Sequence, residues 1–201
     1  MIRRIIVLLA VAFVVLGGTV TGVLAQPNLN QQDKKFLAQA HRSNLTEILA
    51  SRLAEKKTSD ESIRIIARKL VNDHLKIDAA VKKVAQQAGV ELPQQPGPRQ
   101  RAALNKLEKL NGAAFNSVWL KAQIAGHRQT LSNINSELQD GSSAAVKKLA
   151  SEAKPIVQGH LELLLKAHGG GGGGGGGGGS ESPSPQPTST GSMTPSGTST
   201  G

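Results

Sequence analysis

Apolar residues recur at alternating steps of three and four along most of residues 26–168, and this spacing restricts the fold more than any other feature. Such steps place apolar side chains on one face of an α-helix, whereas a half-buried strand needs strict alternation of apolar and polar residues. Glycine and proline fall mainly where a helix could begin or end. The pattern therefore predicts an all-α protein whose helices each bury one apolar stripe.

Four long helices and one short helix are expected. The predicted ranges are about residues 32–57, 58–89, 99–110, 112–140 and 144–168. Thr58 and Glu61 have the spacing of a capping box, so Thr58 is the predicted N-cap of the second helix. Pro155 lies inside the last helix and is expected to kink it. Four long helices of this kind predict an antiparallel up-down bundle, with a short extra helix between the second and third.

Three of the apolar stripes each contain one histidine. The stripes are Ile63, Ala67, Leu70, His74, Ile77, Val81 and Val84; Leu120, Ile124, His127, Leu131, Ile134 and Leu138; and Val146, Leu149, Ala153, Ile156, His160, Leu163 and Ala167. A buried imidazole loses hydration and needs a hydrogen bond or a metal ion in compensation. Three such residues leave two interpretations open, which are a shared metal site and hydrogen-bonded core histidines.

The helical rise allows these residues to meet at one level of the bundle. Counted from the turns at about 1.5 Å per residue, Glu47 and His74 differ in height by roughly 6 Å. His127 and His160 differ by roughly 7 Å on the same count. Those differences correspond to little more than one helical turn, so a single cluster is permitted.

Residues 1–25 have the pattern of an export signal. Arg3 and Arg4 precede twelve apolar residues, 5–16, and small residues occupy the positions before Gln26. We expect cleavage after Ala25 and a domain in the periplasm or outer envelope. An uncleaved N-terminal membrane anchor is the alternative, because the 21 residues 5–25 carry no charge.

The C-terminal residues 169–201 are predicted to have no stable fold. Eleven consecutive glycines, 169–179, bury no side chain, and twelve of the following 22 residues are Ser or Thr. The segment could be a spacer, a glycosylated stalk, a protease-tolerant end, or an unstructured extension without chemistry. The folded domain is therefore expected to span residues 26–168.

The domain is basic and contains no cysteine. The chain has 24 Lys and Arg against 14 Asp and Glu, and Arg3, Arg4 and Glu181 lie outside the domain, which leaves it a net charge of +9. This charge would favour anionic envelope polymers or lipid headgroups as partners, or it could belong to an ordinary solvated surface. Nucleic acid is not expected, because Phe36, Phe115 and Trp119 are too few to form a stacking platform. The absence of Cys excludes disulfides and thiolate metal sites.

Several short segments, taken in order, resemble a bacterial family of exported, ferritin-like domains of unknown function from the outer membrane or periplasm. They are Phe36-Leu37, Asn44-Leu45-Thr46-Glu47-Ile48, Leu70-Val71-Asn72-Asp73-His74, Gly112-Ala113-Ala114-Phe115, Gly126-His127 and Gly159-His160-Leu161. The resemblance covers about residues 33–167. It implies a ferritin-like antiparallel four-helix bundle with a metal site and no established reaction.

The resemblance implies Glu47, His74, His127 and His160 as metal ligands, with Asp73 beside them. Asp73 lies about 100° around its helix from His74, so it could orient one of the other ligand histidines. Glu47 could instead be a polar bundle residue paired with a Lys or Arg, and Asp73 could instead pair with Lys69. His41 lies outside the pattern and is expected at the surface or at the domain boundary.

The chain departs from di-iron proteins of this architecture. Those proteins use Glu-x-x-His on two helices, whereas Val71 and Val157 lie three residues before His74 and His160. Three imidazoles with at most one carboxylate suit one divalent Zn, Cu, Ni or Fe ion better than two hard iron ions.

The sequence allows two classes of function. One is an exported helical bundle with a His-rich metal site, and the other is a non-catalytic basic envelope module with structural or interaction roles whose buried histidines bind no metal. No catalytic residue is assigned, because no serine motif or paired carboxylates are placed for catalysis. If the protein is an enzyme, we expect a metal-dependent redox activity. The oligomeric state is left open.

Overall fold

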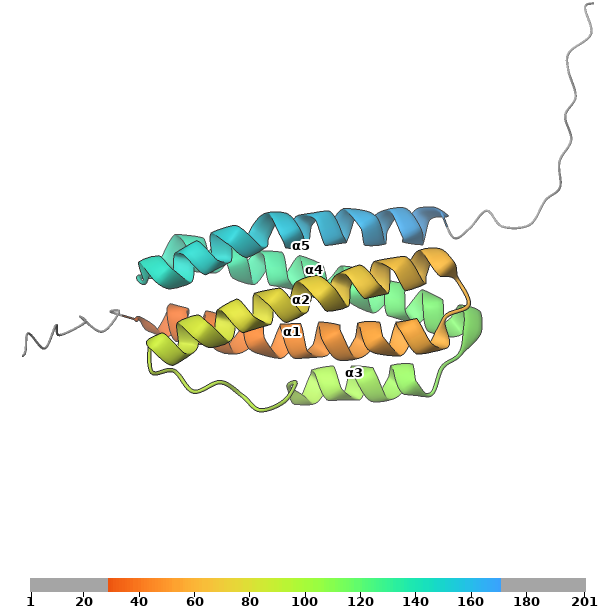
Figure 1. The fold of residues 1–201 in the computed structure, drawn as a ribbon, viewed down its shortest axis with the longest axis horizontal. Helices are drawn as coiled ribbons and strands as arrows, with labels where there is room; N and C mark the ends of the chain where they lie inside the picture. The colour runs from red at the N-terminus through yellow and green to blue at the C-terminus, as the bar shows by residue number, and fades with distance from the viewer. Residues whose placement is uncertain (1–28, 171–201) are drawn as a thin grey trace, which may run out of the picture.

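The computed structural model describes residues 29–170, which form five α-helices and no strand (Figure 1). The helices are α1 (Gln31–Lys57), α2 (Glu61–Gln87), α3 (Pro98–Glu108), α4 (Gly112–Asp140) and α5 (Ala144–Gly170). The prediction of an all-α fold is confirmed for these residues. The predicted signal and residues 171–201 of the tail lie outside the described range. α5 includes Gly169 and Gly170, two residues beyond the predicted domain limit.

The four long helices lie side by side, and the short α3 lies along the outer side of α1 (Figure 1). α1 packs against α2, α4 packs against α5, and contacts of α1 with α4 and of α2 with α5 complete the arrangement. The α1–α2 connection and the α4–α5 connection lie at opposite ends. Within residues 29–170, no helix combines the length and apolar character that a bilayer crossing requires.

The start of α2 differs from the capping box predicted at Thr58. The N-cap is Asp60, whose Oδ1 accepts hydrogen bonds from the backbone N–H groups of Ser62 and Ile63 at 2.9 and 3.2 Å. Thr58 instead ends α1, and its N–H donates to the carbonyl of Ala54. The prediction was wrong because Asp60 is also a preferred N-cap residue and stands directly before the first helical residue.

The buried stripes of α2 and α5 also differ from the predicted ones. Beyond His74, α2 buries Asp78 and Ala85 in place of Ile77 and Val84. In α5, Val157 and Leu164 are buried, whereas Ile156 and Leu163 are 38% and 36% exposed. A strict heptad assumes 3.5 residues per turn, and a straight α-helix with 3.6 drifts about 20° per heptad. Two buried positions in each helix therefore lie one residue later than predicted, whereas Val81 and His160 keep their predicted buried places.

The apolar core is divided into two parts by a polar layer. One part includes Leu70, Phe115 and Trp119, with the Trp119 indole N–H donating to the carbonyl of Ala50 at 3.1 Å. The other part includes Phe36 and Val81. Between them lie buried polar side chains from all four long helices: Asn44, Glu47, His74, Gln123, His127 and His160.

Asp33 fastens the start of α1 to the turn between α4 and α5. Its buried carboxylate accepts from the backbone N–H groups of Asn30 and Ser143 at 2.7 and 3.0 Å, and from the Ser142 hydroxyl at 2.7 Å. Ser143 donates to Oδ1, and the other two groups donate to Oδ2. Burial acts to raise the pKa of Asp33, but these hydrogen bonds outweigh it and lower that pKa to about 2. The buried Glu137 lies beside Asp33, and burial with the neighbouring carboxylate raises the pKa of Glu137 to about 7.

Replacing Gly141 by alanine should destabilise this junction. Gly141 has an ordinary φ of −66°, but a Cβ there would meet the Glu137 carboxyl and lie 2.6 Å from the Glu137 carbonyl oxygen. We expect a loss of about 1–3 kcal/mol in the free energy of unfolding, because the turn or Glu137 must move. Urea denaturation measures the loss. Gly159→Ala is the control, since a Cβ at that position meets nothing within 4 Å, and equal effects would contradict the prediction.

Candidate metal centre

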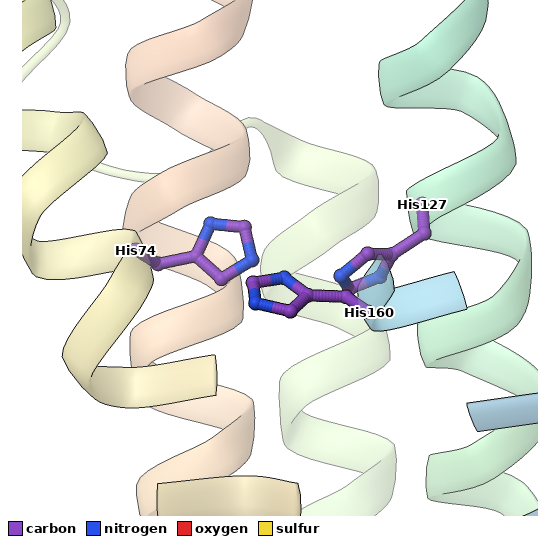
Figure 2. A group of neighbouring side chains, drawn as sticks. All are labelled: His74, His127 and His160. Atoms are coloured by element: carbon purple, nitrogen blue, oxygen red, sulfur yellow. The ribbon is translucent and has the colours of Figure 1, made fainter. Parts of the chain in front are cut away.

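Three histidines from α2, α4 and α5 converge in the polar layer of the core (Figure 2). His74, His127 and His160 are 3%, 1% and 0% exposed, and their ring centroids are separated by 5.3–5.5 Å. One ring nitrogen of each residue lies within 4.8 Å of one ring nitrogen of both others. We call these residues the three-histidine cluster.

Each imidazole in the cluster is held by a hydrogen bond at one ring nitrogen. His74 Nδ1 lies 2.8 Å from Asn44 Oδ1, His127 Nδ1 lies 2.8 Å from the backbone oxygen of Gln123, and His160 Nε2 lies 3.0 Å from Asp73 Oδ2. All three partners are oxygen acceptors, so each ring donates at the nitrogen that is held. In a neutral imidazole the other nitrogen is then an unprotonated acceptor.

The remaining three ring nitrogens have no hydrogen-bond partner among the described residues. They are His74 Nε2, His127 Nε2 and His160 Nδ1, and all are buried. A buried polar atom without a partner costs about 1–3 kcal/mol, so three in one cluster are expensive for a core with no other role. A metal ion would satisfy all three, and an imidazole whose second nitrogen is fixed by an oxygen acceptor is the usual form of a histidine ligand.

The cluster is electrostatically suited to neutral imidazoles. Burial lowers the pKa of His127 to about 4, with the charge of His160 acting in the same direction. Burial and the neighbouring histidines hold the pKa of His74 well below its usual range. Burial also lowers the pKa of His160, against the opposing influence of Asp73. At pH 7 the rings therefore have the protonation state that metal coordination requires.

A metal ion would require a modest contraction of the cluster. Metal–nitrogen bonds of about 2.0–2.1 Å in a tetrahedral site place ligand nitrogens about 3.4 Å apart. The nitrogens here lie within 4.8 Å of one another, so side-chain rotations that close the gap by about an ångström are needed. The residues present thus fit one ion with nitrogen ligands.

Comparison with known proteins places the chain in a family. The model of a family described as a domain of unknown function, DUF4142, matches residues 18–166. The chain belongs to the DUF4142 family. No curated protein matches it. The crystal structure of a DUF305 fragment from Deinococcus radiodurans is similar to it in fold, with a TM-score of 0.64 and 12% identity over 71% of this chain and 99% of that one.

Asp73 contacts the cluster of this DUF4142 domain from its edge. Besides His160, its Oδ2 accepts from Lys69 Nζ at 2.8 Å, so the carboxylate makes both contacts that the sequence left open. Burial acts to raise the pKa of Asp73, but the hydrogen bonds and charges of Lys69 and His160 outweigh it and lower that pKa. Asp73, the residue before His74 in α2, thus places its carboxylate against the ring of His160.

Replacing Asp73 by asparagine should weaken metal binding about 10- to 100-fold. The amide can still accept from His160 Nε2 but carries no charge to strengthen the ring as a ligand, and changes to such partners typically have this effect. Competition with a chelating dye measures the affinity. Asp60→Asn, which removes a carboxylate at the α2 N-cap, is the control and should bind metal as the wild type does. Equal affinities of wild type and Asp73→Asn would contradict the prediction.

Glu47 is not part of the three-histidine cluster, although it is buried in the same layer. Burial raises the pKa of Glu47 to about 8, against a hydrogen bond with Gln123. It has no ion pair with a Lys or Arg within residues 29–170. Glu47 and Gln123 instead line a cavity of about 280 Å³ between α1, α3 and α4.

Two residues that hold the cluster were not predicted as site residues. Asn44 belongs to the segment 44–48 that carries the family resemblance, but its contact with His74 could be found only by placing α1 beside α2. Gln123 lies four residues before His127, a spacing at which a helical side chain can reach the earlier carbonyl.

The prediction that His41 lies at the surface or at the domain boundary was wrong. His41 is 5% exposed, and its Nδ1 lies 2.6 Å from the buried carboxylate of Asp78. Asp78 is buried because of the drift of the α2 stripe, and a buried carboxylate needs a partner such as His41.

Proposed function

We propose that this chain is an exported, ferritin-like antiparallel four-helix bundle that binds one divalent transition-metal ion at His74, His127 and His160. The observation that carries the proposal is the set of three buried ring nitrogens without hydrogen-bond partners, each on a ring fixed at its other nitrogen. The fold similarity to the DUF305 fragment and the side-by-side long helices support the bundle. The pattern of residues 1–25 supports export.

The ligand set favours Zn, Cu, Ni or Fe(II) over hard cations such as Mg and Ca. Neutral imidazole is a good ligand for the first group, whereas the second group prefers oxygen ligands. Bound there, the ion would supply Lewis acidity or, if it is Cu or Fe, redox chemistry. The chain's own residues hold the rings in one orientation and exclude bulk water, since none of the three is more than 3% exposed.

Elemental analysis of the mature chain from residue 26 onward, purified from the periplasm without a His tag, tests the proposal. We expect close to one metal ion per chain in the wild type and less than about a tenth of that after His74, His127 and His160 are all changed to Gln. His168→Gln is the matched control, because His168 is exposed at the end of α5 and outside the cluster. Circular dichroism shows whether each variant is folded.

Two results would contradict the proposal. One is a folded triple variant that retains as much metal as the wild type. The other is a wild type without metal whose melting temperature is unchanged by chelator and by added Zn, Cu, Ni or Fe. The second result would instead support the basic envelope module with core histidines.

A further inference from the structure

An ion bound by the three-histidine cluster must cross a closed protein surface to reach it. None of the three rings is more than 3% exposed, and apolar core lies on both sides of the layer. A divalent cation that loses its water before meeting a protein ligand has a high free energy in an apolar interior. A route to the cluster therefore needs a polar group that touches both solvent and a cluster imidazole.

Three residues make hydrogen bonds to the cluster, and they differ in their access to solvent. Asn44 is 3% exposed, and Gln123, whose backbone oxygen holds His127, is 2% exposed. The side chain of Asp73 is 19% exposed, and its Oδ2 lies 3.0 Å from His160 Nε2. Among these partners, Asp73 is thus the one that connects a cluster ring to the surface.

We infer that Asp73 is the first protein ligand of an incoming divalent transition-metal ion, which then passes to His160 between α2 and α5. This inference rests on the proposed metal centre. A carboxylate at the surface can bind a cation that still keeps most of its water. From there the ion lies beside the ring of His160, whose unpaired Nδ1 is the nitrogen that replaces a water ligand as the ion moves inward.

Two lysines control this access point in the metal-free protein. Lys69 Nζ lies 2.8 Å from Asp73 Oδ2, and Lys76 Nζ lies 4.0 Å from Oδ1. Both lysines are exposed, with 51% and 80% of their side chains accessible, so neither is locked in place. The arriving cation must displace the ammonium group of Lys69 and overcome its repulsion. Lys69 therefore slows uptake without being a ligand.

Glu47 offers the competing route on the other side of the cluster. Its carboxyl lines the cavity between α1, α3 and α4, but it is 8% exposed and bonds to Gln123 rather than to a cluster imidazole. The direct contact between Asp73 and His160 favours the α2–α5 side.

The rate of cobalt uptake tests the inference. Metal-free full-length protein is mixed with Co²⁺ in a stopped-flow instrument, and the visible absorbance of bound Co²⁺ is followed. Lys69→Gln should take up Co²⁺ about 3- to 10-fold faster than the wild type, with the same final absorbance. Lys148→Gln is the matched control, because Lys148 makes an i,i+4 ion pair with Glu152 on the surface of α5 and loses the same charge. Its rate should match that of the wild type.

Glu47→Gln distinguishes the two routes and should leave the uptake rate unchanged. Equal rates for Lys69→Gln and Lys148→Gln would overturn the inference, as would slower uptake in Glu47→Gln with no effect at Lys69. Either result leaves the metal centre itself intact, because Co²⁺ is still bound. Absence of bound Co²⁺ in every chain would overturn the metal centre together with its access route.

Discussion

Metal-free protein in which His127 is replaced by leucine should be more stable than the metal-free wild type by about 1–2 kcal/mol at pH 7. The wild-type ring buries Nε2 without a hydrogen-bond partner, and leucine of similar volume removes that unpaired atom. His127 is the best of the three positions for this change. Its Nδ1 bonds to a backbone oxygen in α4, so no side chain loses its partner. Replacing His74 would instead leave Asn44 Oδ1 without a partner, and replacing His160 would remove one of the two hydrogen bonds that Asp73 Oδ2 accepts.

Urea denaturation in the presence of chelator measures this gain, and the same variant should lose metal binding. His41→Leu is the matched control, because His41 is also buried on an inner face but pairs with Asp78 at 2.6 Å. That change leaves a buried carboxylate short of a partner and should cost about 1–3 kcal/mol. A loss of stability in His127→Leu comparable to that in His41→Leu would show that the cluster is ordinary core packing.

The contrast between His127 and His41 carries the functional argument. Both rings are buried in α-helices of the same bundle, and each has a hydrogen bond at Nδ1. His41 faces one carboxylate and forms a completed pair, whereas His127 faces two further imidazoles that cannot satisfy its second nitrogen. A gain of stability in His127→Leu would therefore indicate that the wild-type chain keeps the cluster for binding rather than for stability.

The helices could be predicted because their signals are local. The steps of three and four residues, Gly89 after α2 and Asn111 before α4 place the elements within one or two residues of their observed ends, except at the start of α2. At that point Thr58 and Asp60 are both good N-caps, and spacing alone does not choose between them. The burial of Val157 rather than Ile156 depends on how α5 rotates against its neighbours, which a seven-residue repeat does not describe.

The cluster was predictable in part because each histidine interrupts an apolar stripe. Its supporting contacts were not, since they depend on helix rotation and on side-chain rotamers. Asn44 and His74 are 30 residues apart, and Asp73 and His160 are 87 apart. The pairing of Asp33 with the α4–α5 turn spans 109 residues and lies outside every motif that the sequence offered.

That pairing should make the stability of the protein depend on pH through Glu137. Its pKa is raised from 4.5 to about 7 by burial and by Asp33, so the native state keeps a proton that the unfolded chain releases above pH 4.5. The native state then binds more protons than the unfolded state, and stability contributed by this group falls as pH rises from about 4.5 through 7. Asp33 acts in the opposite sense. Its pKa is lowered from 3.8 to about 2, so its contribution is lost as pH falls through that range.

Glu137→Gln should therefore remove a fall of about 3 kcal/mol in the free energy of unfolding between pH 4.5 and 8. The amide stays neutral at every pH and can still donate to the Asp33 carboxylate, as the protonated Glu137 does. Glu47 titrates in an overlapping range, so the measurement is the difference between variant and wild-type unfolding free energies at each pH. Glu162→Gln, on the exposed face of α5, is the matched control for the loss of one carboxyl group. A flat difference for Glu137→Gln would mean that Glu137 is ionised in the native state, and the two carboxyls would then repel rather than share a proton.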